Sequence, residues 1–239
     1  MRYLVDPAQV WMTSEAWLFL ILVCVLLPIA ALRQQQRMAA TADAAGGGAL
    51  DVPRTRLYAS ALFTHAVFLV LVWTTARYFT TSLLSAYAPK SSHVAIGLAA
   101  LTLGLLPLLP QLQIGNPVGK ARAQLLAPRT PREFALFGVV CVSAGVAEEL
   151  TYRGVLFTLL AALVGGWWVP AIASAAVFGV VHLFQGWRSA SIAGLIGLRD
   201  QIVVGLTGTL FVAIVIHILH DAITGAVISA RVRQEPNAL

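Results

Sequence analysis

Two adjacent carboxylates and a guanidinium lie inside an otherwise apolar stretch of the sequence. Glu148, Glu149 and Arg153 follow fourteen uncharged residues, and the next ionisable residue along the chain is His182. On a helix, Glu149 and Arg153 are four residues apart and can form an ion pair, whereas Glu148 points about 100° away. This spacing leaves Glu148 without a counter-charge on its own helix.

Two histidine clusters follow in separate apolar stretches. Phe178 and His182 share one helix face through their four-residue spacing, and so do His217 and Asp221. His220 lies roughly 60° from the second face and is a weaker candidate for the same site. A charged residue in the middle of a membrane costs about 2.5–3.5 kcal/mol, which favours convergence of the three clusters on one polar cavity.

Such a cavity could activate a water molecule. A buried carboxylate beside an imidazole forms a general-base pair, which here would be Glu148 with His182. A second imidazole, that of His217, could donate a hydrogen bond to an oxyanion. Neither Ser143 nor Cys141 lies in a recognised nucleophile motif, so activated water is favoured over a covalent intermediate.

Zinc is the competing chemistry, because one glutamate and two histidines form a common catalytic zinc set. The sequence has no His-Glu-x-x-His motif, and its candidate ligands are spread over three apolar stretches. We therefore expect no metal and no other cofactor.

Four further polar residues are predicted to be structural. His65 is isolated in an apolar stretch, and His93 follows two serines. Arg199 and Asp200 are expected to form a local ion pair or to lie in a short helix near a surface. Residues of these types are more often hydrogen-bonded ties between helices than parts of a catalytic site.

The elements that hold all these residues are predicted to be membrane helices. Hydrophobic residues make up 59% of the 239 residues and charged residues 11%, with a mean hydropathy of +0.82. An average soluble domain has about 25% charged residues. The net charge of +6 resides mostly between the apolar stretches, which argues against nucleic-acid binding. We expect an integral membrane protein, without a disulfide between Cys24 and Cys141.

Seven apolar stretches are predicted to form one all-α membrane helix bundle. They lie near residues 17–32, 57–79, 94–112, 134–164, 169–186, 190–206 and 208–230. We expect an N-terminal transmembrane region over 1–130 and a catalytic membrane domain over 131–239. Residues 33–56 are predicted to be a flexible loop. Residues 134–164, about 46 Å long as a helix, must tilt, break or protrude from an apolar core of about 30 Å.

Basic residues alternate between the connections. Four arginines lie within 33–56 and four basic residues within 113–133, whereas residues 80–93 contain only Lys90. The positive-inside rule then predicts an N-terminus outside the cell and a C-terminus in the cytoplasm.

The three clusters together resemble the CAAX protease and bacteriocin-processing enzyme family, also called CPBP or Abi, which includes the Ras-converting CAAX endopeptidase. The family motifs are Glu-Glu-x-x-x-Arg, Phe-x-x-x-His and His-x-x-x-Asn or Asp, each on its own membrane helix. This sequence has them in the same order, as Glu148-Glu149-Leu150-Thr151-Tyr152-Arg153, Phe178-Gly179-Val180-Val181-His182 and His217-Ile218-Leu219-His220-Asp221. The resemblance covers about residues 134–230, and residues 1–130 show no family motif.

The resemblance implies a helical, metal-independent glutamic endopeptidase. Glu148 with His182 would activate the water that attacks the scissile carbonyl, and His217 with residue 221 would hold the oxyanion. A carboxylate repels an oxyanion, so Asp221 would have to be protonated or to orient His217.

The remaining motif residues would support the site. The resemblance implies that Glu149 and Arg153 pair to position Glu148, and that Phe178 lines the substrate side. The implied partners are the lipid bilayer and a peptide or membrane-protein substrate, of prenylated type or a leader peptide. The implied location is a bacterial cell (inner) membrane. A non-proteolytic scaffold that regulates a partner, and a proton-coupled carrier, stay open as alternatives, and the oligomeric state is not indicated.

Overall fold

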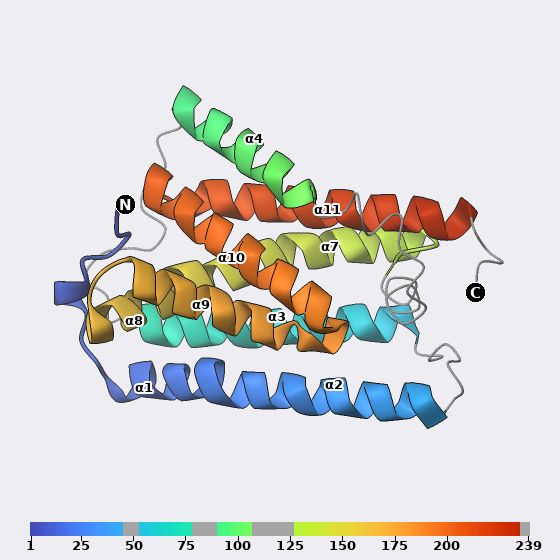
Figure 1. Cartoon of the computed structure of the whole chain (residues 1–239), viewed down its shortest axis with the longest axis horizontal. Helices are drawn as coiled ribbons and strands as arrows, with labels where there is room; N and C mark the ends of the chain where they lie inside the picture. Colours follow the sequence, from blue (N-terminus) through green and yellow to red (C-terminus); the bar gives the residue numbers. More distant parts are fainter. Residues whose placement is uncertain (45–52, 78–89, 107–126, 235–239) are drawn as a thin grey trace.

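The computed structural model describes residues 1–44, 53–77, 90–106 and 127–234, and the structural statements below concern these residues. All regular structure in them is helical (Figure 1). The elements in chain order are η1 (Pro7–Gln9), α1 (Ser14–Ile21), η2 (Leu22–Leu26), α2 (Leu27–Ala44), α3 (Arg54–Ala76), α4 (Ser91–Leu105), α7 (Pro131–Glu148), η3 (Glu149–Leu156), α8 (Phe157–Val164), α9 (Trp168–Val181), η4 (Leu183–Gln185), α10 (Trp187–Thr207) and α11 (Leu210–Gln234). The predicted all-α fold is confirmed.

Five helical segments of the described chain are long and apolar enough to cross a membrane. They are Ser14–Arg37, Arg54–Ala76, Pro131–Val164, Trp187–Thr207 and Leu210–Arg233. Two shorter apolar helices, α4 and α9, correspond to the two other predicted segments. The number of about seven therefore fits, and the protein is an integral membrane protein. Residues 78–79 and 107–112 of the predicted segments lie outside the described residues.

The helix α2 is longer than the sequence analysis expected. It continues through the beginning of the predicted loop 33–56 and ends at Ala44. Residues 33–44 are mostly Arg, Gln, Ala and Met, which are strong helix formers, and the first glycine comes only at Gly46. The prediction of a loop is thus wrong for 33–44 and for 54–56, which begin α3, while 45–52 lie outside the described residues.

A capping box fixes the start of α7, the helix that carries Glu148. The Thr130 hydroxyl accepts a hydrogen bond from the Glu133 backbone N–H at 3.2 Å, and the Glu133 carboxylate accepts one from the Thr130 N–H at 3.1 Å. Pro131 occupies the first turn, where its missing N–H has no cost. The position of Glu148 along the bundle is set from this end.

The long segment Pro131–Val164 remains helical but changes its winding where the charged residues lie. Residues Glu149–Leu156 form a π-helical stretch between α7 and α8, and all eight of them are buried. Stretches of π-helix are rare and occur often at functional sites. Of the three expected outcomes, tilt, break or protrusion, the described chain shows no break in this segment.

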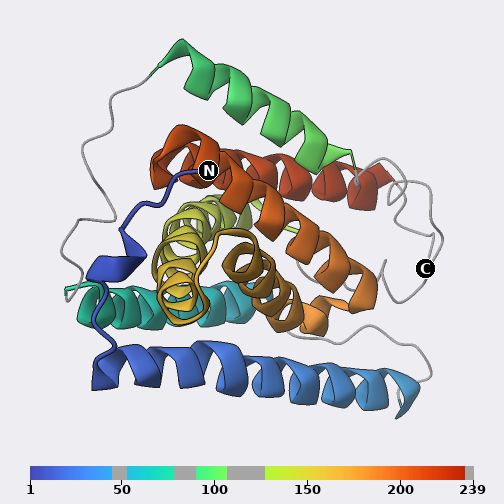
Figure 2. The same cartoon turned by 60° about the vertical axis from the view of Figure 1, so that its left-hand side comes forward.

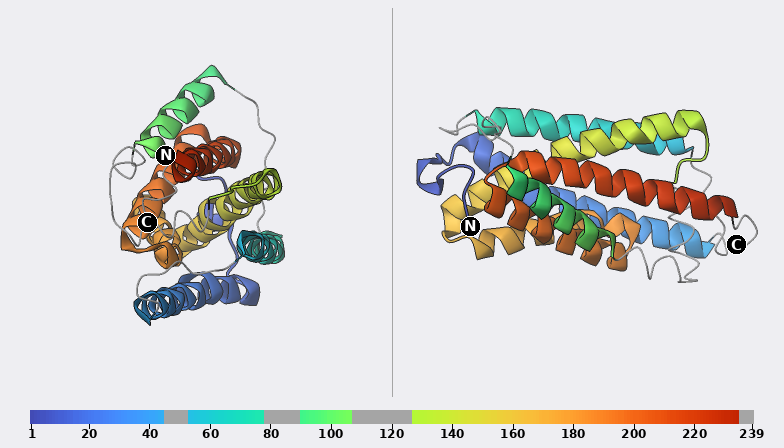
Figure 3. Two further views of the ribbon diagram at one scale, coloured as in Figure 1. Left: turned by 90° about the vertical axis from the view of Figure 1, so that its right-hand side faces the viewer. Right: turned by 90° about the horizontal axis from the view of Figure 1, so that it is seen from above.

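The motif helices lie in the middle of the bundle. Figure 2 shows α1 and α2 along one outer side of the bundle and α4 along the opposite side. Between them lie α7, α9, α10 and α11, and Figure 3 shows the same order from one end. One apolar cluster joins α1 to the middle through Phe19, Val23 and Phe68, which pack with Tyr152 and Phe178. The outer helices therefore close the sides of the motif region.

Close backbone approach brings α9 against α10. A Cβ added at Gly179 would lie 2.8 Å from the Ala190 carbonyl oxygen, which only glycine avoids. The turn that follows α9 ends at Gly186, whose φ of +101° favours glycine. This short turn lets α10 run back along α9.

Both halves of the chain contribute to one bundle. Helix α3 packs against α7 and η3, and α4 packs against α10 and α11. The predicted boundary near residue 130 stays a prediction.

Candidate active site

Glu148 lies at the end of α7 between two imidazoles from other helices. Its Oε1 is 3.4 Å from His65 Nε2 on α3, and its Oε2 is 3.7 Å from His217 Nε2 on α11. The Glu148 side chain is 14% exposed, whereas that of Glu149 is completely buried. Glu148 is therefore the carboxylate of the adjacent pair that water can reach.

His182 closes the C-terminal end of α9. Its Nδ1 is 2.7 Å from the Phe178 carbonyl oxygen, which can only accept, so Nδ1 donates its hydrogen there. The neutral ring then has a free lone pair on Nε2, which can accept a proton. His182 also interacts electrostatically with Glu148.

The Phe178 ring lies next to both motif histidines. Its centroid is 4.6 Å from that of His182 and 6.4 Å from that of His217. Helices α7, α9 and α11 thus bring Glu148, His182 and His217 together, as the three sequence clusters suggested. The histidine on α9 and the histidine on α11 share an aromatic wall.

His217 is surrounded by carboxylates. Its Nδ1 lies 2.7 Å from Glu149 Oε1, and its Nε2 lies 3.5 Å from Asp221 Oδ2. Asp221 is also 3.4 Å from His220 Nδ1, and its side chain is 35% exposed. The imidazole of His217 is therefore fixed by Glu149 on one side and faces Glu148 and Asp221 on the other.

Glu149 and Arg153 form the ion pair that their spacing predicted. Arg153 Nη1 is 3.1 Å from Glu149 Oε1, and both side chains are at most 2% exposed. The guanidinium also lies over the Phe178 ring, 4.3 Å from its centroid. Glu149 contacts His217 directly, so this pair fixes the histidine, whereas the sequence analysis expected it to position Glu148.

Arg199 and Asp200 form the expected local ion pair, at 2.7 Å, but they do not lie near a surface. Asp200 is completely buried and Arg199 is 9% exposed. Asp200 Oδ2 lies 3.6 Å from Arg153 Nη2, which connects α10 to the site. Of the two predicted alternatives, the local ion pair is therefore the one that forms, and Ala100 on α4 and Arg153 on η3 contact it.

His65 is the residue that sequence reasoning missed. It was predicted to be a structural residue away from the site, yet it contacts Glu148 and also lies 2.8 Å from the Ser143 hydroxyl through Nδ1. No local spacing could reveal this, because its partners are about eighty residues further along the chain. The available signal was an imidazole in the middle of a membrane segment, where a polar partner is required.

The only metal-type grouping in the described residues consists of Glu149, Asp200 and His217, whose ligand atoms lie within 4.8 Å of one another. It is not the zinc set considered from the sequence, which was Glu148 with two histidines. Both carboxylates are already paired with arginines, at 3.1 Å for Arg153 and 2.7 Å for Arg199. Two guanidiniums this close to the carboxylates would repel a divalent cation bound there. The grouping therefore fits a charge-paired network better than a metal centre.

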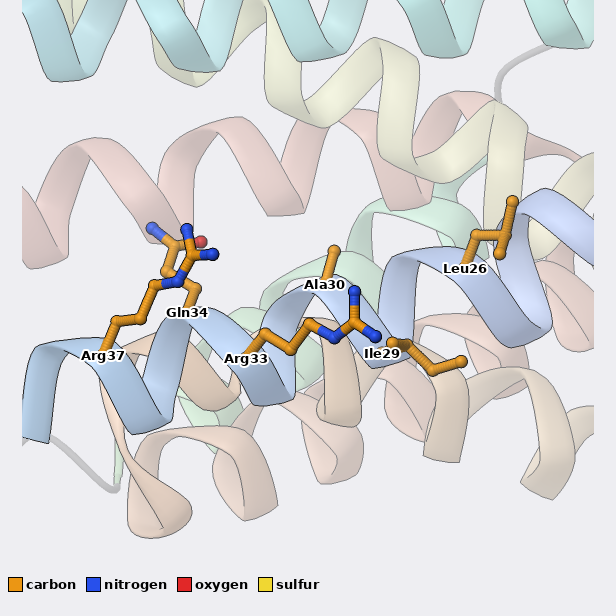
Figure 4. A pocket seen from close by; sticks show the side chains of 6 residues that line it. All are labelled: Leu26, Ile29, Ala30, Arg33, Gln34 and Arg37. Atoms are coloured by element: carbon orange, nitrogen blue, oxygen red, sulfur yellow. The ribbon is translucent and has the colours of Figure 1, made fainter.

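A cleft lies along an exposed face of η2 and α2. Helix α2 packs against α9 and η4. The cleft measures about 500 Å³ and is lined by Leu26, Ile29, Ala30, Arg33, Gln34 and Arg37. Figure 4 shows Leu26, Ala30 and Gln34 pointing to one side of the helix, with Arg37 beside Gln34 and the Arg33 side chain extending towards Ala30 and Ile29. The cleft therefore combines apolar side chains with two guanidiniums.

These features define an integral membrane helix bundle with a carboxylate and imidazole cluster between its helices. Residues 130–223 match the family model described as type II CAAX prenyl endopeptidase, Rce1-like. Residues 130–223 therefore form a domain of the type II CAAX prenyl endopeptidase (CPBP) family, which is a family of proteases. The resemblance proposed from the motifs is confirmed. No curated protein and no solved structure was found to match the chain.

Proposed function

We propose that the protein is a metal-independent glutamic endopeptidase that hydrolyses a peptide bond within or beside the membrane. The observation that supports this most directly is the surrounding of Glu148. This partly exposed carboxylate lies 3.4 Å and 3.7 Å from two imidazoles and interacts electrostatically with His182. A carboxylate held among imidazoles is suited to remove a proton from water.

In the proposed reaction, Glu148 and His182 take one proton from a water molecule as its oxygen attacks the scissile carbonyl. His182 can receive this proton on Nε2, since its Nδ1–H is engaged with the Phe178 carbonyl. The same proton then passes to the leaving amine, which breaks the C–N bond. The second proton of the water stays on the attacking oxygen, so the products are a new carboxylic acid, which then releases that proton to solvent, and a new amine. No covalent enzyme intermediate forms.

His217 would stabilise the oxyanion that develops on the carbonyl oxygen. The Glu149 carboxylate accepts the Nδ1–H, which fixes the ring and directs Nε2 towards the space beside Glu148. Asp221 faces the same Nε2 at 3.5 Å and favours a positively charged ring. We assign Asp221 the task of orienting His217, because its own carboxylate would repel an oxyanion.

The proposed substrate is a peptide with an apolar attachment and a free carboxylate, as in a prenylated C-terminal peptide. The family description names prenyl endopeptidases. The cleft on η2 and α2 offers apolar side chains, Leu26 and Ile29, and two cations, Arg33 and Arg37. Helix α2 itself packs against α9 and η4, the elements on either side of His182. Leader peptides and membrane-protein segments are the alternative substrates.

The test is cleavage of a fluorogenic farnesylated CAAX-type peptide by the purified protein in lipid vesicles. We expect Glu148→Gln and His182→Asn each to lower kcat about a hundredfold or more, because general acid–base groups contribute roughly 10²–10⁴. Glu15→Gln is the matched control, since Glu15 pairs with Arg77 on the exposed surface. Its activity should equal that of the wild type.

Full activity of folded Glu148→Gln would exclude the proposed mechanism. If the wild type cleaves no peptide, the membrane proteomes of cells with wild-type protein and with Glu148→Gln are compared. A membrane protein that accumulates only with the variant would identify a natural substrate. Identical proteomes would instead favour the non-proteolytic scaffold.

A further inference from the structure

His65 joins the N-terminal part of the chain to the reacting carboxylate. It lies in the middle of α3, outside the family-matched segment 130–223, and it is 6% exposed. Its ring spans two residues of α7: Nδ1 is 2.8 Å from Ser143 Oγ and Nε2 is 3.4 Å from Glu148 Oε1. No residue of the three family motifs supplies this contact.

Ser143 anchors the ring of His65. Its hydroxyl has a single hydrogen, which it can donate either to the Val140 carbonyl at 3.0 Å or to His65 Nδ1 at 2.8 Å. When it donates to Nδ1, the neutral ring carries its own hydrogen on Nε2. With Nδ1 held at Oγ, the opposite ring nitrogen faces the Glu148 carboxylate. An ionised carboxylate only accepts, so Nε2 presents its N–H to Oε1.

The two oxygens of Glu148 therefore face different helices. Oε1 is next to His65 on α3, and Oε2 is next to His217 on α11. The other titratable or charged groups close to this arrangement come from α7, η3, α9, α10 and α11, and they are Cys141, Glu149, Tyr152, Arg153, His182, Arg199, Asp200, His220 and Asp221. Of the groups around Glu148 in the described residues, His65 is the one that contacts Oε1.

We propose that His65 is a positioning residue that holds Oε1 of Glu148 and thereby directs Oε2 to His217 and the attacking water. This inference rests on the proposed role of Glu148. A purely structural tie between α3 and α7 would be complete with the Ser143 contact and the packing around it. Contact with the carboxylate adds orientation of the base, which packing does not supply.

Four variants separate these two roles: His65→Leu, His65→Gln, Ser143→Ala and the control His93→Leu, a second buried histidine on α4. Peptide cleavage is measured in vesicles as kcat and KM. Loss of a hydrogen bond to a charged group should lower kcat of His65→Leu about ten- to hundredfold. KM should stay within about twofold. His65→Gln retains an amide donor and should recover most of kcat, while His93→Leu should resemble the wild type.

Infrared difference spectra test the contact without any substrate. The carboxylate band of Glu148 is identified by its loss in Glu148→Gln. It should shift in His65→Leu and in Ser143→Ala, and it should stay in place in His93→Leu. If His65→Leu does not accumulate as folded protein, Ser143→Ala supplies the same comparison, because it removes only the anchor of Nδ1.

An unchanged Glu148 band in folded His65→Leu or Ser143→Ala would overturn the inference. So would equal losses of kcat in His65→Leu and His65→Gln, which indicate packing rather than a donor. An inactive wild type whose band shifts as expected would contradict the proposed protease activity while leaving the His65 contact supported.

Discussion

At the scale of single residues, the two adjacent glutamates have different surroundings. Glu149 is completely buried between Arg153 and His217, whereas Glu148 is partly exposed. Removal of one partner from a buried ion pair leaves an unpaired charge, which is strongly destabilising. Glu149 should therefore contribute mainly to folding, and Glu148 mainly to catalysis.

We expect Glu149→Gln to lower the free energy of unfolding by about 3 kcal/mol or more, because the buried Arg153 loses its closest carboxylate. Glu148→Gln should change it much less. Chemical unfolding of the purified variants in detergent micelles measures both. Equal stability of the two variants would contradict this division of roles. Replacement of both partners, in Glu149→Leu with Arg153→Met, should recover part of the loss.

Local spacing was sufficient for some residues and not for others. The ion pair of Glu149 with Arg153 follows from their separation by four residues, so the sequence predicted it correctly. His65 and Glu148 are 83 positions apart in the sequence, and only the packing of α3 on α7 brings them into contact. Asp200 was missed for the same reason, since its second arginine lies on η3.

At the scale of elements, the site depends on how closely the helices approach one another. Helices α9 and α10 touch at Gly179, three residues before His182. Hydropathy predicted that both helices exist, because apolar stretches of this length are typical of membrane segments. It did not predict the π-helical stretch. It also did not predict the extended end of α2, which follows from helix propensity.

Gly179→Ala tests the approach of α9 to α10. The added Cβ would meet the Ala190 carbonyl oxygen at 2.8 Å, so the two helices must separate. Overpacking of this kind costs about 1–3 kcal/mol and should displace His182. We expect lower thermal stability and lower kcat.

Gly138→Ala on α7 is the matched control for this prediction, because an added Cβ there has no neighbour within 4 Å. It should keep activity and preserve or raise stability, since alanine favours helix more than glycine does. Equal behaviour of the two alanine variants would show that the close approach at Gly179 is not required.

At the scale of the whole molecule, the charged ends of the helices indicate how the bundle lies in the membrane. The beginning of α3, the beginning of α7 and the end of α11 lie at one end of the bundle (Figure 1). Contacts join them there: Arg54 pairs with Glu133 at 3.9 Å, and Arg233 donates to the Arg129 carbonyl at 3.2 Å. The start of α1 lies at the other end.

We propose that the arginine-rich end faces the cytoplasm of a bacterial cell and that the N-terminus lies outside. A fluorescent-protein fusion at the C-terminus should then be bright, and an alkaline phosphatase fusion at the same position should be inactive. An inactive fluorescent fusion with an active alkaline phosphatase fusion would show that the C-terminus lies outside the cell instead. Replacement of Arg231 and Arg233 by glutamine, in contrast, should leave the fold intact and weaken the orientation preference.

The π-helical stretch Glu149–Leu156 has a consequence for the register of the chain. A π turn includes one more residue than an α turn, so the helix before this stretch and the helix after it are offset relative to a uniform α-helix. Deletion of a single residue here would rotate everything on one side by about 100° relative to the other. Glu148 would keep its place beside His65 while Arg153 left its place beside Asp200, or the reverse. Tolerance of length changes should therefore be low in this stretch and high after α11.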